Sequence, residues 1–159
     1  MLTPDERREM ITRIQRLPAK LREVLENLNN EQLDTPYGPG KWTPRQVAHH
    51  LADSHMNAFA RMKLILTENH PTLKPYDQEA WAETIEAKSL AIGPSLSILE
   101  GLHARWCHLM ESLSDADWRR SAKHPEMGEV TLDNFLGIYA RHGERHVAQV
   151  RALREEKGW

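Results

Sequence analysis

The sequence predicts an all-α protein, a four-helix bundle with long crossover connections. Apolar side chains recur with a helical period over four stretches, which are 5–29, 43–68, 94–113 and 131–156. β-branched and aromatic residues alternate nowhere for long, so there is almost no strand signal. We expect one helical domain over residues 1–159, because this length is that of a single domain.

Three of the helices have recognisable starts. Thr43 is placed as an N-cap, with Pro44 at the first helical position and Gln46 completing a capping box. Pro94 opens the third helix in a similar manner, and Thr131 is the expected N-cap of the fourth. These signals fix where three of the four segments begin.

The two halves of the chain resemble each other weakly. In each half a helix is followed by an acidic turn, an irregular crossover with Pro and Gly, and a helix that carries histidines. The pattern favours a pseudo-symmetric bundle. The remaining irregular stretch, 69–92, is expected to cover the site and to contain a short helix at about 78–90.

Composition excludes several classes of protein. The net charge of −2 and the scattered Lys and Arg give no sign of a nucleic-acid partner. No apolar run follows Met1, so we expect no signal peptide, and no stretch approaches the roughly 20 apolar residues of a membrane span. The single cysteine, Cys107, suits a reducing cytoplasm. Nine histidines, against three tyrosines and two phenylalanines, favour metal or acid–base chemistry.

Two of these histidines, His142 and His146, lie in the apolar stripe of the last helix. At about 100° per residue, Phe135 falls about 20° from the direction of His142, and His146 about 40° from it. Both imidazoles therefore face the predicted core. Two buried imidazoles one helical turn apart are hard to satisfy together without a shared ion, so we interpret the pair as two ligands of a metal site.

The third ligand is expected in the second helix, which holds three histidines, His49, His50 and His55. Relative to the apolar face around Val47, His50 lies at about 60° on one side and His55 at about 80° on the other. His49 lies at about 160°, so we expect it on the solvated surface. His55, at the edge of the apolar face, is a candidate for a position behind a ligand. The predicted metal ligands are His50, His142 and His146.

Several short motifs, in order along the chain, carry a resemblance to a known family. They are 41–47 (KWTPRQV), 49–57 (HHLADSHMN), 72–77 (TLKPYD), 99–103 (LEGLH) and 152–159 (ALREEKGW). With these motifs the chain resembles the DinB-like superfamily. Within it, the match is to the YfiT (bacillithiol transferase-like) branch of inferred metal-dependent hydrolases. The resemblance covers essentially the whole chain.

The resemblance implies a helical bundle that holds one divalent metal ion, zinc or nickel in relatives, in a cytoplasmic homodimer. The family's first histidine ligand directly precedes Leu-Ala, which makes it His50 here. Its last two ligands form a His-x-x-x-His pair, here His142 and His146. Some DinB-like relatives transfer low-molecular-weight thiols, whereas this branch carries the name of a hydrolase.

Three neutral imidazoles with one open coordination position are typical of a catalytic zinc site, because structural zinc normally has four protein ligands. The open position would hold a water whose pKa the metal lowers. We therefore expect a metal-dependent hydrolase of a small molecule. One alternative is a thiol S-transferase, in which a thiol replaces the water. The other is a non-catalytic stress-response bundle whose ion stabilises the fold.

Three charged residues near the predicted ligands need an interpretation. Asp53 is the nearest candidate for a catalytic general base, with orientation of a histidine or an ordinary surface position as alternatives. Arg61 is a candidate to bind an anionic substrate group, although an interhelical ion pair is the simpler expectation. Glu144 lies about 200° from His142 and is expected on the surface, which excludes the zinc-protease motif.

The remaining candidates have structural interpretations. Cys107 is expected to be a packed thiol rather than a nucleophile. Tyr139 faces inward and lines either a cavity or the core. His124, in the crossover, is a candidate to reach the mouth of the site, with exposure to solvent as the simpler expectation. Glu100 and His103 form the one Glu-x-x-His motif, so a di-iron carboxylate site, which needs two, is excluded.

Overall fold

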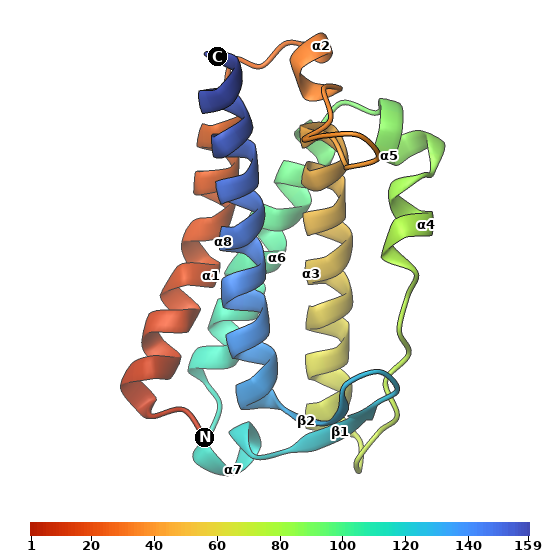
Figure 1. Ribbon diagram of the computed structural model, residues 1–159. Helices are drawn as coiled ribbons and strands as arrows, with labels where there is room; N and C mark the ends of the chain where they lie inside the picture. The colour runs from red at the N-terminus through yellow and green to blue at the C-terminus, as the bar shows by residue number, and fades with distance from the viewer.

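The computed structural model describes residues 1–159, and four long helices form its body (Figure 1). They are α1 (Pro4–Leu25), α3 (Pro44–Thr67), α6 (Gly93–Glu111) and α8 (Leu132–Lys157). Helices α1 and α8 lie side by side and run in one direction, and α3 and α6 run in the other. Each pair also packs against the other, since α1 contacts α6 and α3 contacts α8. The predicted four-helix bundle is confirmed.

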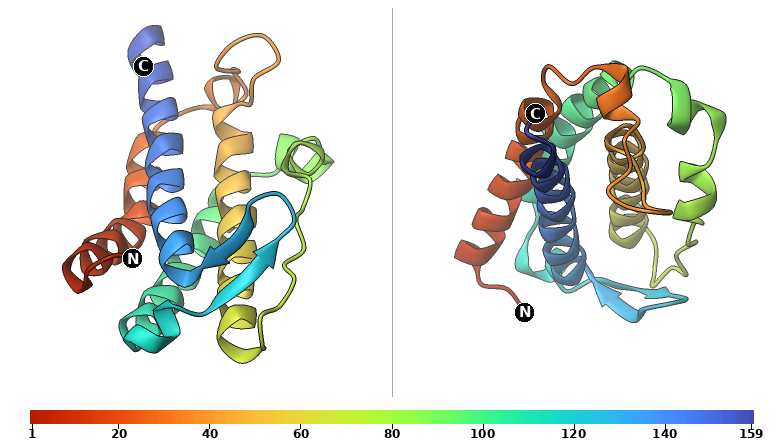
Figure 2. Two further views of the ribbon diagram at one scale, coloured as in Figure 1. Left: turned by 60° about the horizontal axis from the view of Figure 1, so that its bottom comes forward. Right: turned by 45° about the horizontal axis from the view of Figure 1, so that its top comes forward.

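The connections explain this topology. Helix α2 (Asn30–Leu33) joins α1 to α3 at one end of the bundle. The parallel helices α3 and α6 need a long crossover, which returns along the outside of α3 and contains α4 (Gln78–Ala82) and α5 (Ile85–Ser89) (Figure 2). The short helix expected at about 78–90 is therefore two shorter ones.

The link between α6 and α8 contains α7 (Asp115–Trp118) and a hairpin that the sequence did not predict. Strands β1 (Ser121–His124) and β2 (Gly128–Thr131) pair antiparallel, with Ala122 opposite Val130. Each strand has four residues, which is too short for alternation to stand out in the sequence.

The predicted helix starts agree with the structure. The Thr43 hydroxyl accepts a hydrogen bond from the backbone N–H of Gln46, whose side chain returns the bond to the N-cap N–H. Thr131 caps α8 in the same way with Asn134 as its partner. Helix α6 begins at Gly93, one residue before Pro94, without a side-chain cap.

The core consists of two apolar clusters stacked along the bundle axis. One contains Ile14, Met62, Trp106 and Phe135 among its members. The other contains Leu17, Leu51, Leu99 and Val147 among its members. His55 of α3, His103 of α6, and His142 and His146 of α8 fall between the members of these two clusters in their helices, so the bundle has a polar layer at mid-height.

At the level of this layer, α1 and α8 approach each other closely. Gly143 is buried, and a Cβ atom placed on it would lie 2.3 Å from a side-chain carbon of Leu17. Any side chain at this position would have to displace the Leu17 side chain, at the contact between α1 and α8 next to His142. None of the helices is both long and apolar enough to cross a membrane.

Candidate metal centre

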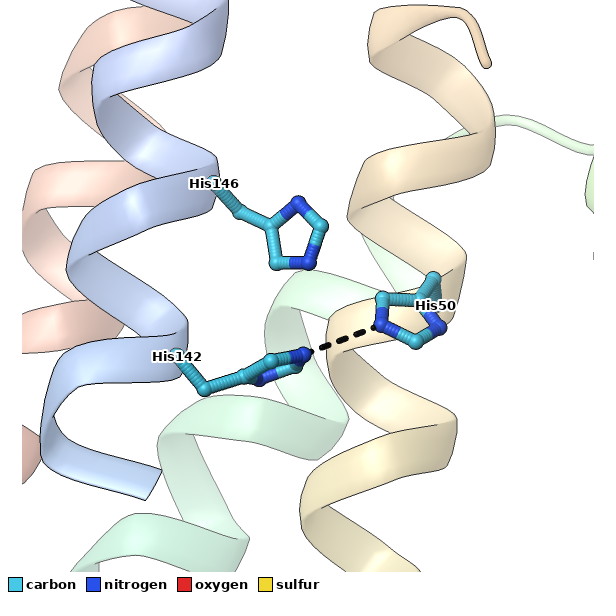
Figure 3. Close-up of side chains that lie close together, drawn as sticks. All are labelled: His50, His142 and His146. Carbon is cyan, nitrogen blue, oxygen red and sulfur yellow. Dashed lines mark hydrogen bonds between the residues drawn. The ribbon is translucent and has the colours of Figure 1, made fainter. Parts of the chain in front are cut away.

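Three histidine side chains from two helices converge at one side of the bundle (Figure 3). His50 comes from α3, and His142 and His146 come from successive turns of α8. One nitrogen of each ring lies within 4.8 Å of the others. His50 and His146 are only 4% and 5% exposed, so water competes weakly for their nitrogens.

The spacing of these atoms fits a tetrahedral metal ion. Zn–N bonds of about 2.0–2.1 Å at tetrahedral angles place two ligand nitrogens roughly 3.3–3.4 Å apart. Nε2 of His50 and Nε2 of His142 are 3.2 Å apart. The ring of His146 is 4.7 Å from that of His142 and 5.0 Å from that of His50, measured between centroids. The His50–His142 pair thus has the spacing of two ligands on one ion, and a nitrogen of His146 lies within 4.8 Å of both.

The electrostatics also favour a cation. Burial lowers the pKa of His50 to about 3, that of His142 to about 2 and that of His146 to about 4. All three rings are therefore neutral at pH 7 and offer lone pairs. No Asp, Glu or Cys joins the cluster, and an all-imidazole set suits zinc, copper, iron or nickel better than calcium or magnesium.

A cavity of about 560 Å³ opens on the side of His50 and His146. Trp42 forms one wall, with its ring 4.5 Å from that of His50 and stacked at 14° over that of His146. The only two buried side-chain polar atoms without a hydrogen-bond partner are the Tyr37 hydroxyl and His146 Nδ1, and both residues line this cavity. Unpaired buried polar atoms cost free energy, so these two atoms are the polar groups beside this cavity that the fold itself leaves unsatisfied.

A second cavity of about 680 Å³ lies on the side of His142. Arg61, Tyr76, His124 and Tyr139 line it. His50 and His146 thus border the first cavity and His142 borders the second, while Gln78 lines both.

Arg61 supplies the second cavity with a positive charge. Arg61 is 8% exposed, and its guanidinium donates to the carbonyl of Lys74 at 2.6 Å and lies over the ring of Tyr76. It has no carboxylate partner within salt-bridge distance, so the expected interhelical ion pair is wrong. A buried guanidinium without a counter-ion favours an anion beside it.

Two histidines that were expected on the surface are buried. His49 is 2% exposed, and its ring bonds to the hydroxyl of Ser95 and the carbonyl of Leu90. His124 is 4% exposed and lines the second cavity. The prediction for His49 failed because α3 is covered on two sides, by the bundle and by the outer crossover. A helical wheel with a single apolar face cannot represent this. The prediction for His124 failed because this residue belongs to β1, a strand that the sequence did not predict.

The other interpretations agree with the structure more closely. His55 is fully buried directly behind His142, with its Nε2 3.4 Å from His142 Nδ1. Cys107 is 3% exposed, and burial raises the pKa of its thiol to about 11, so it is a packed thiol. Glu144 faces away from the triad and pairs with Arg13 and Lys20 on α1 instead of lying free on the surface.

Asp53 lies on the outer side of α3, toward α5. Burial, and then the nearby Glu86, raise the pKa of its carboxyl to about 6, which suits a general base. It lines neither of the two cavities that touch the triad. Its role as the base remains a prediction.

Two residues of the site were not recognised in the sequence. Trp42 was part of a motif but had no assigned role. His103 was considered only as part of a Glu-x-x-His pattern, yet it is 1% exposed and bonds to His55. Its signal was its place in the apolar stripe of α6 with Leu99 and Trp106, which is the argument that found His142 and His146.

Fold and site together define a four-helix bundle with a three-histidine centre of the kind that holds a transition metal. Residues 13–150 match the family model described as the DinB superfamily, and the chain belongs to this family.

Several relatives are similar over nearly the whole chain. A protein of Oceanobacillus iheyensis, named as a metal-dependent hydrolase by inference, is 50% identical over 95% of this chain and 87% of its own length. YfiT of Bacillus subtilis, named in the same way, is 42% identical over 99% of this chain and 89% of its own.

Solved structures agree with the bundle. The structure of YfiT, described as having an unusual four-helix bundle topology, superposes with a TM-score of 0.97 at 41% identity, over 100% of this chain and 91% of that one. TT2238, described as a four-helix bundle protein, has a TM-score of 0.62 at 20% identity, over 92% of this chain and 98% of that one, and supports the fold alone.

Proposed function

We propose that this protein is a hydrolase that acts on a small molecule and uses one divalent ion, zinc or nickel, held by His50, His142 and His146. The observation that carries the proposal is the convergence of three neutral imidazoles, with no fourth protein ligand, beside two cavities. The names of the relatives support the same chemistry.

A metal ion in such a site lowers the pKa of a coordinated water towards neutrality and polarises the bond that is attacked. The protein's own residues would supply binding and orientation. Trp42 shields the rings of His50 and His146 from bulk water on one side. Arg61 would bind an anionic group of the substrate in the cavity beside His142, with Tyr76 and Tyr139 as the walls.

A thiol S-transferase is the second candidate, and the pair of cavities is the observation that favours it. Cavities of about 560 and 680 Å³ that both border the triad provide room for two reactants, a thiol and an electrophile. A hydrolase needs room for only one organic substrate.

The deciding experiment supplies the metal-loaded protein with activated carboxylic esters, with and without low-molecular-weight thiols such as cysteine. Hydrolysis that needs the metal and proceeds without thiol supports the proposal. Consumption of the ester that occurs only with thiol, and that gives a thioester and the free alcohol, overturns it in favour of S-transfer. Stable metal binding without any turnover would indicate the non-catalytic alternative.

The variant series for this assay uses matched histidines. His146→Ala should lose the metal and with it all turnover. His108→Ala, at an exposed position on α6, should retain both the metal and the turnover. The expected homodimer remains a prediction, and light scattering on the purified protein tests it.

A further inference from the structure

A chain of three histidines crosses the whole bundle and ends on a backbone carbonyl. Nδ1 of His142 lies 3.4 Å from Nε2 of His55, and Nδ1 of His55 lies 2.9 Å from Nε2 of His103. Nδ1 of His103 lies 2.7 Å from the carbonyl oxygen of Ile14. The four members come from α8, α3, α6 and α1, so every long helix contributes one.

The carbonyl at the end of the chain determines the direction of every hydrogen bond. A carbonyl oxygen can only accept, so Nδ1 of His103 must carry the proton. In a neutral imidazole the other nitrogen then has the lone pair, so His103 Nε2 accepts from Nδ1–H of His55. By the same reasoning His55 Nε2 accepts from Nδ1–H of His142. The lone pair of His142 is thereby placed on Nε2, the atom that faces His50 in the triad.

The sequence explains why the Ile14 carbonyl is available. In an α-helix this oxygen would accept from the N–H of the residue four positions later. That residue is Pro18, which lies inside α1 and has no N–H. The missing donor leaves the Ile14 oxygen without a partner in its own helix, and His103 supplies the hydrogen bond instead.

The surroundings keep these rings neutral. His55 and His103 are 0% and 1% exposed and lie at the level between the two apolar clusters, with no carboxylate among their hydrogen-bond partners. Burial lowers the pKa of His103 to about 4. The rings of Trp106 and Tyr139 also pack edge-on against the ring of His55, at centroid distances of 5.7 and 5.5 Å.

We propose that His55 and His103 are positioning residues that fix the tautomer of His142 and so prepare its Nε2 for the metal, with Pro18 and Ile14 anchoring the chain. The proposal rests on the metal centre proposed above. It predicts an asymmetry among the ligands. In the metal-free protein His142 Nε2 has no proton, so His50 must donate its own Nε2–H across their 3.2 Å contact. When the metal binds, His50 changes tautomer and His142 does not.

Nitrogen-15 NMR of the histidine rings tests this directly in the metal-free protein at pH 7.5. Protonated and unprotonated ring nitrogens have well-separated shifts, so each tautomer can be assigned. We expect Nδ1–H tautomers for His103, His55 and His142 and an Nε2–H tautomer for His50. After titration with Zn²⁺, only His50 of these four should have exchanged its protonated nitrogen. An Nε2–H tautomer at His142 or His103 in the metal-free protein overturns the proposal.

A variant pair tests the consequence for metal affinity. In His103→Gln the side-chain amide still offers a donor to Ile14 and an acceptor to His55, whereas His103→Leu offers neither. We expect Zn²⁺ affinity to fall on the order of 10–100-fold in His103→Leu, as for the loss of other groups behind metal ligands, and to be largely retained in His103→Gln. Equal affinities in the two folded variants would contradict the relay.

The buried His49 provides the control for a purely structural effect. It also makes two hydrogen bonds, to Ser95 and Leu90, but it has no link to the chain. His49→Leu should lower the melting temperature and leave the Zn²⁺ affinity of the folded protein unchanged. Failure of the metal centre itself gives a different result, because the wild-type protein would then bind no Zn²⁺ while the tautomers of the metal-free protein stayed as assigned.

Discussion

Nε2 of His50 and Nε2 of His142 lie 3.2 Å apart, although the two residues are 92 positions apart in the chain and belong to different helices. Two neutral nitrogens at this distance must share a proton or an ion, because two lone pairs facing each other are repulsive. The bundle therefore holds two donors at the separation of ligands on one metal ion before any ion is bound. Such preorganisation lowers the free-energy cost of binding.

The first prediction concerns metal content. Replacing His50 with Ala, or both His142 and His146 with Ala, should reduce bound zinc or nickel to near zero, because two or fewer imidazoles remain. Elemental analysis of purified protein measures this. His108→Ala changes an exposed histidine and should keep one equivalent. Full metal in the double variant would show that the ion lies elsewhere.

The second prediction concerns acid stability of the metal-free protein. The folded-state pKa of His103 is about 4, below the value of about 6.5 expected in the unfolded chain. Between these values the unfolded state binds more protons, so the free energy of unfolding decreases as the pH falls from about 6.5 to about 4. Above pH 6.5 this contribution is fully present.

Urea unfolding in the presence of a chelator, at several values between pH 4 and 7.5, measures that dependence. One such histidine contributes a slope of up to about 1.4 kcal/mol per pH unit. His103→Gln removes the titrating group, so its curve should be shallower than that of the wild type. Identical slopes would show that His103 is not held neutral.

The third prediction concerns substrate charge. Arg61→Met should weaken the use of esters that carry a carboxylate about 10–100-fold, because a hydrogen bond to a charged group contributes about 1.5–3 kcal/mol. Neutral esters of the same size should be used equally well by both proteins. The ratio of kcat/KM values for the two esters is the measurement. An equal loss of kcat/KM for the charged and the neutral ester would show that Arg61 supports the fold and does not recognise the substrate.

The fourth prediction compares two glycines. Gly143→Ala places a methyl group against Leu17 and should destabilise the fold by about 1–3 kcal/mol and weaken metal binding by displacing His142. Gly101 is exposed in the middle of α6, and a Cβ atom added there would have no other atom within 4 Å, so Gly101→Ala should stabilise the protein by about 0.5–1 kcal/mol. Thermal unfolding distinguishes them, and a stabilised Gly143→Ala would show that α1 and α8 adjust freely.

The long helices were predictable because their signals are local and repeated. The Thr43 and Thr131 caps need only neighbours within three residues, and a helical stripe repeats over many turns. The hairpin was not predicted because each of its strands has only four residues, too few for an alternating pattern to be recognised. The pairing of Ala122 with Val130 depends on the conformation of the turn between the strands. The direction of the crossover around α3 also had no local signal.

The four long helices, and the apolar faces on which His50, His142 and His146 lie, can be derived from the sequence because both follow from spacing along a helix. The burial of His49 and His124 depends on packing between segments that are distant in the chain, so it became evident only in the folded protein. The tertiary structure alone also joined Pro18 to the triad. The carbonyl that this proline leaves free accepts a hydrogen bond from His103, which is linked in turn to His55 and His142. These contacts join different helices, and the periodicity of a single helix does not predict which residues of another helix it will contact.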